Sequence, residues 1–130
     1  MLLEIGREIA RYMKQNVGAV IVREKALDII HRSAKTVEVL HKVVGVSDLY
    51  AWWLTQTEFE EVPVKTVKLL VANDHNAEKD QVAAALTQFV GEQSYDCDDE
   101  SDAVAVGIAW LIMNKLIDSP YPDEKKAKKT

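Results

Sequence analysis

The amino-acid sequence predicts an α/β protein in which helices pack on two parallel strands. Apolar residues recur at helical spacing through several long segments. Residues 18–22 form a short β-branched apolar run, and residues 59–62 form a second run that Pro63 ends. Because these two runs are separated by a helical segment, the strands are expected to pair in parallel.

The N-terminal part of the chain predicts a helix followed by a buried strand. Apolar residues fall on one face at helical spacing over residues 2–13, with charged residues between them. The run over residues 18–22 is apolar enough to be buried on both faces, as strands of parallel sheets are. Glu24 follows this run, so its carboxylate is expected near the carboxyl end of the strand.

The rest of the chain predicts further helices joined by polar loops. The expected elements are a loop over residues 28–35, helices over 36–53 and 64–71, a loop over 72–76, a helix over 77–90 with Gly91 as its C-cap, a loop over 93–98, and a helix over 99–116. We expect one domain over residues 1–118 and a flexible basic tail over residues 119–130.

Composition restricts the class of protein. A chain of 130 residues suits one domain with its own core. Its apolar runs are shorter than a membrane span, so no membrane partner is expected. Cys97 is the single cysteine, which excludes an internal disulfide and favours a reducing, cytoplasmic location.

The net charge of −5 arises from one short acidic cluster. The cluster supplies five of the 21 acids, and the remaining 16 acids balance the 16 basic residues. Its members are Asp96, Asp98, Asp99, Glu100 and Asp102. A local acidic site on an otherwise neutral chain is expected to attract divalent cations.

Asp99 and Asp102 are the strongest candidates for metal ligands. Their spacing of three places both carboxylates on one helix face, and a bound cation would relieve their repulsion. Hard oxygen ligands suit Mg²⁺ or Mn²⁺. Acids in a first helical turn also cap N–H groups and complement the helix dipole, and spacing alone favours that structural role. Small residues over 103–113 predict a buried helix, which would hold these carboxylates near the sheet.

Basic and aromatic side chains offer weaker signals. Lys68 and Lys79 flank a polar loop and could contact phosphates, although 16 basic residues produce such pairs by chance. Glu24 could equally be a surface acid. Trp52 and Trp53 could stack on bases, but packing in a core or an interface is the more common role of tryptophan.

Three motifs carry the most specific signal in the sequence. A Val-Lys pair, a turn and an Ala-Glu-Lys-Asp-Gln-Val helix lie within residues 65–82. Asp-Glu-Ser-Asp-Ala opens the last helix at residues 99–103, and Gly-Ala-Val-Ile-Val-Arg-Glu-Lys spans residues 18–25. Together these motifs resemble the RuvC family of Holliday-junction endonucleases, within the RNase H-like superfamily, and the similarity extends over about residues 2–117.

The resemblance implies an RNase H-like fold and metal-dependent hydrolysis of DNA. It implies that Glu24, Asp99 and Asp102 hold two Mg²⁺ or Mn²⁺ ions, which activate a water and stabilise the leaving oxygen of a phosphodiester. It also implies that three lysines face the DNA backbone, with Lys79 acting in catalysis beside the scissile phosphate. These DNA-binding residues are Lys65, Lys68 and Lys79.

The sequence departs from the family in two ways. The family begins with a strand whose aspartate anchors both metals, followed by two more strands, whereas this sequence opens at what corresponds to the first helix. The expected fold is therefore RNase H-like but truncated at its N-terminus, with a sheet edge that another segment or a partner must cover. Ala26 and Leu27 also stand where the family often has an aromatic residue.

The function expected from this resemblance is structure-selective cleavage of four-way DNA junctions by a cytoplasmic homodimer. Activity of this chain is left open, because three carboxylates without the fourth bind metal weakly. The alternative is a non-catalytic branched-DNA-binding or regulatory module that keeps the fold. A third possibility is a helical interaction domain with no DNA role, which predicts no salt-dependent binding to four-way DNA.

Overall fold

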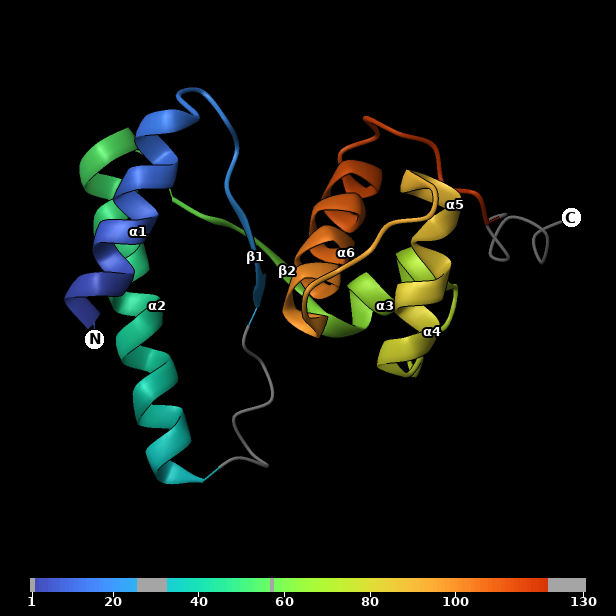
Figure 1. Ribbon diagram of the computed structural model, residues 1–130, viewed down its shortest axis with the longest axis horizontal. Helices are drawn as coiled ribbons and strands as arrows, with labels where there is room; N and C mark the ends of the chain where they lie inside the picture. Colours follow the sequence, from blue (N-terminus) through green and yellow to red (C-terminus); the bar gives the residue numbers. More distant parts are fainter. Residues whose placement is uncertain (1, 26–32, 57, 122–130) are drawn as a thin grey trace, which may run out of the picture. The chain divides into compact units, whose positions relative to one another are not determined.

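The computed structural model describes residues 2–25, 33–56 and 58–121. It confirms a mixed α/β chain that is mostly helical and has one sheet of two parallel strands, β1 and β2 (Figure 1). The elements are α1 (Leu2–Gln15), β1 (Val22–Lys25), α2 (Ala34–Thr55), β2 (Glu60–Pro63), α3 (Val64–Ala72), α4 (Lys79–Ala85), α5 (Thr87–Val90) and α6 (Asp98–Met113). No helix in the described ranges is long and apolar enough to cross a membrane.

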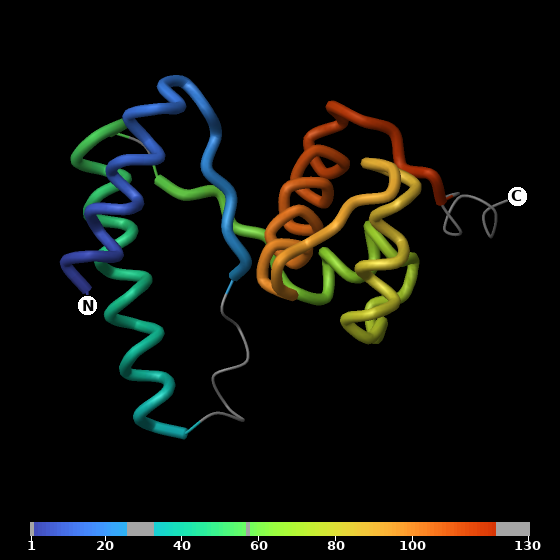
Figure 2. Tube along the Cα trace, viewed as in Figure 1, coloured from blue at the N-terminus to red at the C-terminus, as the bar shows by residue number. Residues whose placement is uncertain are grey.

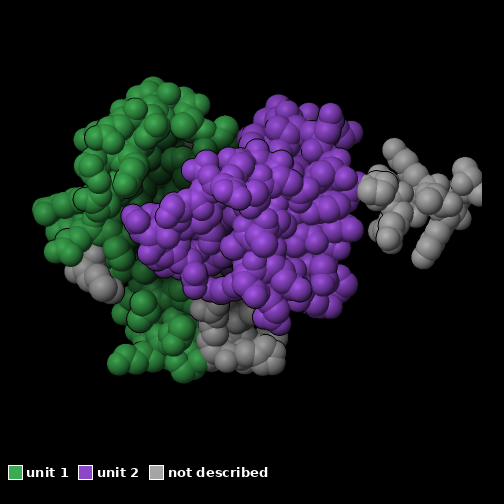
Figure 3. All heavy atoms as spheres, turned by 45° about the vertical axis from the view of Figure 1, so that its right-hand side comes forward, with its two compact units in different colours: residues 1–21, 26–61 green, residues 22–25, 62–130 purple. Residues whose placement is uncertain are grey.

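The chain divides into two compact units (Figure 3). Unit 1 comprises residues 1–21 and 26–61, and unit 2 comprises residues 22–25 and 62–130. Most of the predicted loop over residues 28–35 and most of the predicted basic tail lie outside the described residues. The RNase H-like fold and the single domain over residues 1–118 remain predictions.

Unit 1 is built on the packing of α1 against α2 (Figure 2). The predicted helices over residues 2–13 and 36–53 are confirmed. α1 continues two residues further at its C-terminal end, and α2 is two residues longer at each end. Ser33 caps the start of α2, since its hydroxyl oxygen accepts a hydrogen bond from the backbone N–H of Thr36. The residues that the two helices bury are Gly6, Met13, Ser47 and Ala51. Most of them are small, which allows the two helix backbones to approach closely.

Gly6→Ala is expected to destabilise unit 1, because a Cβ at position 6 would lie 2.8 Å from Cζ and 2.9 Å from Cδ2 of Tyr50. Alanine improves helix propensity by about 1 kcal/mol, but moving a packed ring costs about 1–3 kcal/mol. The net loss, measured by urea denaturation and circular dichroism, is expected to reach up to about 2 kcal/mol. Gly45→Ala is the matched control: its Cβ would meet no atom within 4 Å. That variant is expected to gain about 0.5–1 kcal/mol, and a similar gain in both variants would contradict the close packing.

The buried strand predicted over residues 18–22 is wrong in position. The structure forms β1 over Val22–Lys25, and Val17 and Val20 are exposed. Gly18 has a φ of 85°, in the left-handed region that glycine favours, and the N–H of Ala19 donates to the carbonyl of Asn16. The first half of the apolar run is therefore used in a turn after α1.

Pairing of the strands begins beside Ile21, whose carbonyl accepts from the N–H of Glu60 at 3.0 Å. The second strand was predicted over residues 59–62, and β2 agrees within one residue. Pro63 ends β2 and precedes α3, which suits a residue that lacks a backbone N–H. The predicted helix over residues 64–71 is likewise confirmed.

Unit 2 holds the main hydrophobic core. Val62, Val71 and Leu86 are its largest fully buried side chains. β1, α3 and α4 all contact α6, whose small residues Ala105 and Ala109 are buried. The buried last helix predicted from its small residues is confirmed, although it ends at Met113 and not at residue 116.

The helix predicted over residues 77–90 is interrupted. It forms α4 and α5, with Leu86 between them. The N–H of Phe89 donates to the carbonyl of Leu86, three residues earlier, and so tightens the turn at this point. Glu78 caps α4 together with Gln81, whose side chain accepts from the N–H of Glu78 at 2.8 Å. Gly91 ends α5 with a φ of 73°, which confirms its predicted role as C-cap.

A long-range hydrogen-bonded bridge joins Tyr121 to α3 and α5. The Tyr121 hydroxyl donates to the carbonyl of Val71 at 2.8 Å and accepts from Nε2 of Gln88 at 2.6 Å. Val71 belongs to the last turn of α3, where carbonyl groups lack helical partners. The Tyr121 bridge therefore gives a free carbonyl at the end of α3 a hydrogen-bond partner. It also fixes the segment after α6 to the rest of unit 2.

Candidate active site

All six predicted site residues belong to unit 2. They lie on four of its elements: Glu24 on β1, Lys65 and Lys68 on α3, Lys79 on α4, and Asp99 and Asp102 on α6. These elements share one core, because β1, α3 and α4 each pack against α6. The candidate site can thus be described within one compact unit.

The first turn of α6 positions the acidic cluster. Ser101 is buried, and its hydroxyl donates to the carbonyl of Asp98 at 2.9 Å. The Glu100 carboxylate accepts from the N–H of Asp96 at 2.8 Å, so this acid fixes the chain entering the helix. At least one member of the cluster therefore has a structural role at the start of the helix.

Asp99 and Asp102 differ in their surroundings. The buried stripe of α6 runs through Ser101, Ala105 and Ala109. Asp102 follows Ser101 directly and lies at the edge of this stripe, where it is partly buried. Asp99 lies three residues before Asp102 on the same helix face, and it is exposed.

The structure brings two of the predicted site residues, Lys79 and Asp102, into direct contact. Lys79 Nζ lies 3.5 Å from Asp102 Oδ2, although the residues are far apart in sequence. The Lys79 side chain is 71% exposed and that of Asp102 is 36% exposed. A pair of this exposure contributes about 0–1 kcal/mol, because water screens it. Lys79 can therefore leave Asp102 at little cost when another anion approaches.

The carboxylates fit a metal site only in part. Asp99 and Asp102 offer hard oxygen donors one turn apart, which suits Mg²⁺ or Mn²⁺. Glu24 lies exposed near the end of β1, the strand that contacts α6. Within residues 2–25, 33–56 and 58–121, however, no three His, Cys, Asp or Glu side chains lie close enough together to hold a metal ion. At least one of these three carboxylates would therefore have to move to complete a metal site.

Lys65 and Lys68 share one face of α3 because they are three residues apart. Lys65 is exposed and Lys68 is partly buried, and the buried residues Val67 and Val71 fix the helix in the core. Because α3 is anchored in this way, the ammonium groups of both lysines are carried by a helix that is fixed in the core.

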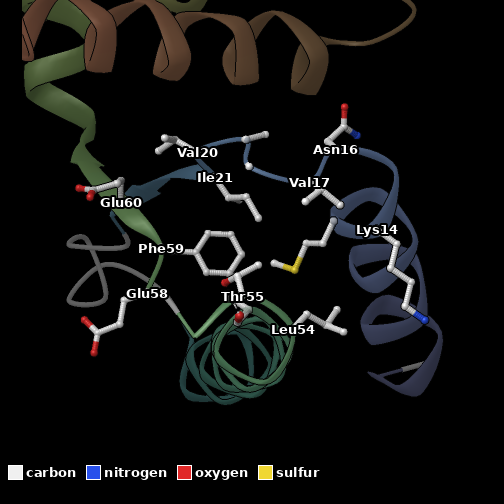
Figure 4. A pocket seen from close by; sticks show the side chains of 14 residues that line it. Lys14, Asn16, Val17, Val20, Ile21, Leu54, Thr55, Glu58, Phe59 and Glu60 are labelled. Carbon is white, nitrogen blue, oxygen red and sulfur yellow. Dashed lines mark hydrogen bonds between the residues drawn. The ribbon is translucent and has the colours of Figure 1, made fainter.

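Sequence reasoning missed a cavity in unit 1, shown in Figure 4. Its volume is about 540 Å³, and its wall combines apolar and charged side chains. Ile21 and Phe59 point toward its centre, while Lys14 and Glu58 lie at its margin. Residues from the end of α1, the turn after it and the end of α2 form the wall. No local pattern signals a cavity built from such separate segments.

The two neighbouring tryptophans of α2 also differ from expectation. Packing in a core or an interface was the expected role, and Trp52 is 53% exposed and Trp53 is 69% exposed. A place in the core is therefore wrong for both, because the hydrophobic contact of α2 with α1 uses small residues such as Ala51. Packing in an interface stays a prediction.

Comparison with known proteins adds no family assignment. No protein-family model matches the sequence, and no curated protein matches it.

Proposed function

We propose that this chain is a structure-selective DNA endonuclease that hydrolyses phosphodiesters of four-way junctions with Mg²⁺ or Mn²⁺. The observation that carries the proposal is the contact between Lys79 and Asp102. These residues come from two motifs that resemble the RuvC family independently of each other. Their proximity supports a shared site, since a catalytic lysine and a metal-binding aspartate must both reach one phosphate.

The proposed roles follow from the chemistry of each side chain. Asp99 and Asp102, joined by Glu24, would hold the metal, which when bound supplies a nucleophilic water and stabilises the leaving oxygen. Lys79 balances the charge of Asp102 in the free protein and transfers its contact to the scissile phosphate when DNA binds. Lys65 and Lys68 neutralise backbone phosphates from α3. We propose a homodimer, because paired cuts in a symmetric junction need two sites.

A second candidate function is a non-catalytic module that binds branched DNA. The same contact favours it, because an aspartate already neutralised by lysine has less need of a metal. In this case the lysines of α3 and α4 bind DNA without hydrolysis.

Cleavage of an end-labelled four-way junction tests the proposal. We expect strand scission with Mg²⁺ or Mn²⁺, no scission in EDTA, and little scission of a linear duplex of the same sequence. Gel-shift titrations at several salt concentrations should accompany the assay. Tight, salt-sensitive junction binding without scission in any metal would favour the binding module. If the chain neither cleaves nor binds the junction, both functions are excluded for this chain.

A further inference from the structure

A groove between α1 and α2 in unit 1 combines basic and aromatic side chains. Its volume is about 640 Å³, which lies within the range of ligand sites. Six of its residues carry the argument: Arg7, Arg11 and Lys14 from α1, and Tyr50, Trp53 and Leu54 from α2. No acidic residue is among the described residues that line it. The groove therefore offers positive charge beside an apolar surface.

The three cations form a row along one face of α1. Arg7, Arg11 and Lys14 follow one another at spacings of four and three residues. With a rise of 1.5 Å per residue, their positions are separated by about 6 Å and about 4.5 Å along the helix axis. A linear polyanion with closely spaced charges matches such a row better than a single anion does.

Arg11 is held in place within this row. Its Nη2 donates to the Glu8 carboxylate at 2.7 Å and its Nε at 3.2 Å, and the guanidinium lies 4.9 Å from the centre of the Tyr12 ring. The hydrogen bond and the charge of Glu8 raise the pKa of Arg11, so the guanidinium stays charged. Because Glu8 offsets the charge of Arg11, Arg7 and Lys14 supply the excess positive charge.

Two aromatic rings of α2 complete the groove. The ring centres of Tyr50 and Trp53 are 6.1 Å apart, and their planes are inclined by 46°. Trp53 is 69% exposed, so a large apolar surface faces water beside the cations. Stacking on a planar base would cover this surface, and every base has a face suitable for stacking.

We propose that this groove binds single-stranded nucleic acid, with backbone phosphates on the cations of α1 and a base stacked on Trp53 beside Tyr50. The combination of a basic row and an exposed aromatic ring is the chemistry that recognises single strands without sequence preference. A symmetric second copy fits less well, because it would bring a second row of the same cations to the interface. The proposal concerns unit 1 alone and does not depend on cleavage by the carboxylates of unit 2.

The test measures binding of the full chain to a fluorescein-labelled 12-nucleotide oligothymidine by fluorescence anisotropy in EDTA. With two phosphates neutralised by Arg7 and Lys14, affinity is expected to fall about sevenfold between 50 and 200 mM salt. Trp53→Ala is expected to weaken binding about tenfold or more. Arg7→Gln and Lys14→Gln are each expected to lower the slope of log affinity against log salt by about 0.7.

Matched controls separate the groove from the rest of the chain. Trp52→Ala removes the neighbouring exposed ring, which does not line the groove, and Lys42→Gln removes an exposed α2 lysine paired with Glu38. Both are expected to bind like the wild type. Circular dichroism checks that each variant is folded.

Four outcomes would overturn the proposal. Trp53→Ala could bind the oligonucleotide as well as the wild type does, or Trp52→Ala could lose as much affinity as Trp53→Ala. A poly-glutamate peptide that binds as tightly as oligothymidine would show that the groove takes acidic chains in general. The chain could also fail to bind the oligonucleotide and show a molecular mass that rises with protein concentration. If Trp53→Ala abolished this rise, the groove would be assigned to a second copy of the chain.

Discussion

Replacing Leu86 by alanine is expected to lower the free energy of unfolding of unit 2 by about 2–5 kcal/mol. Leu86 is 1% exposed and belongs to the core with Val62 and Val71. It lies between α4 and α5, where the tightened turn fixes its backbone. The helices around it are held by their own contacts with α6, so they cannot close fully around the space that alanine leaves.

Urea denaturation followed by intrinsic fluorescence and circular dichroism measures this loss. Trp110, which packs against the core of unit 2, reports on the same region. Leu116→Ala provides the control, since it makes the same chemical change at an exposed position of unit 2. That control is expected to shift stability by no more than about 0.5 kcal/mol. Equal losses in both variants would show that Leu86 is not the centre of the core.

Asp102→Asn is expected to reduce junction cleavage by at least about 100-fold, on the proposed function, while leaving the fold intact. Asparagine has the shape of aspartate but lacks the negative charge that a hard divalent cation requires. The variant also removes the ion pair with Lys79. Because both side chains are substantially exposed, stability is expected to change by less than about 1 kcal/mol.

Single-turnover cleavage of the labelled junction at saturating metal measures this loss, and thermal denaturation checks the fold. Asp96→Asn is the control: it removes one charge from the same acidic cluster at a position before α6. Its cleavage rate is expected to stay within a fewfold of the wild type. If Asp102→Asn cleaved at the wild-type rate, or if both variants lost the same cleavage rate, Asp102 would have no specific role in the reaction.

The helices were predictable because their signals are local. The apolar stripe over α1, the Pro63 boundary and the Gly91 cap each depend on residues close in sequence. The first strand was misplaced because the apolar run over residues 18–22 carries no information about its partner. The turn at Gly18 and the pairing with β2 together move the strand to Val22–Lys25.

The candidate site was predictable only where motifs encode it. The contact of Lys79 with Asp102 connects two motifs that had been singled out separately. The groove on unit 1 was not foreseen, because its basic row lies on α1 and its aromatic rings lie on α2. Each half resembles an ordinary helix surface in the sequence. Only the packing of the two helices shows that the charges and the rings face the same space.

The Tyr121 bridge has a consequence for the kinetics of folding. It joins residues that are 50 positions apart, so the intervening chain must be ordered before the hydrogen bond can form. Contacts made late contribute little to the folding rate and act mainly by slowing unfolding. The hydroxyl of Tyr121 is thus expected to lengthen the lifetime of folded unit 2, whereas the speed of its formation is set by the local helices.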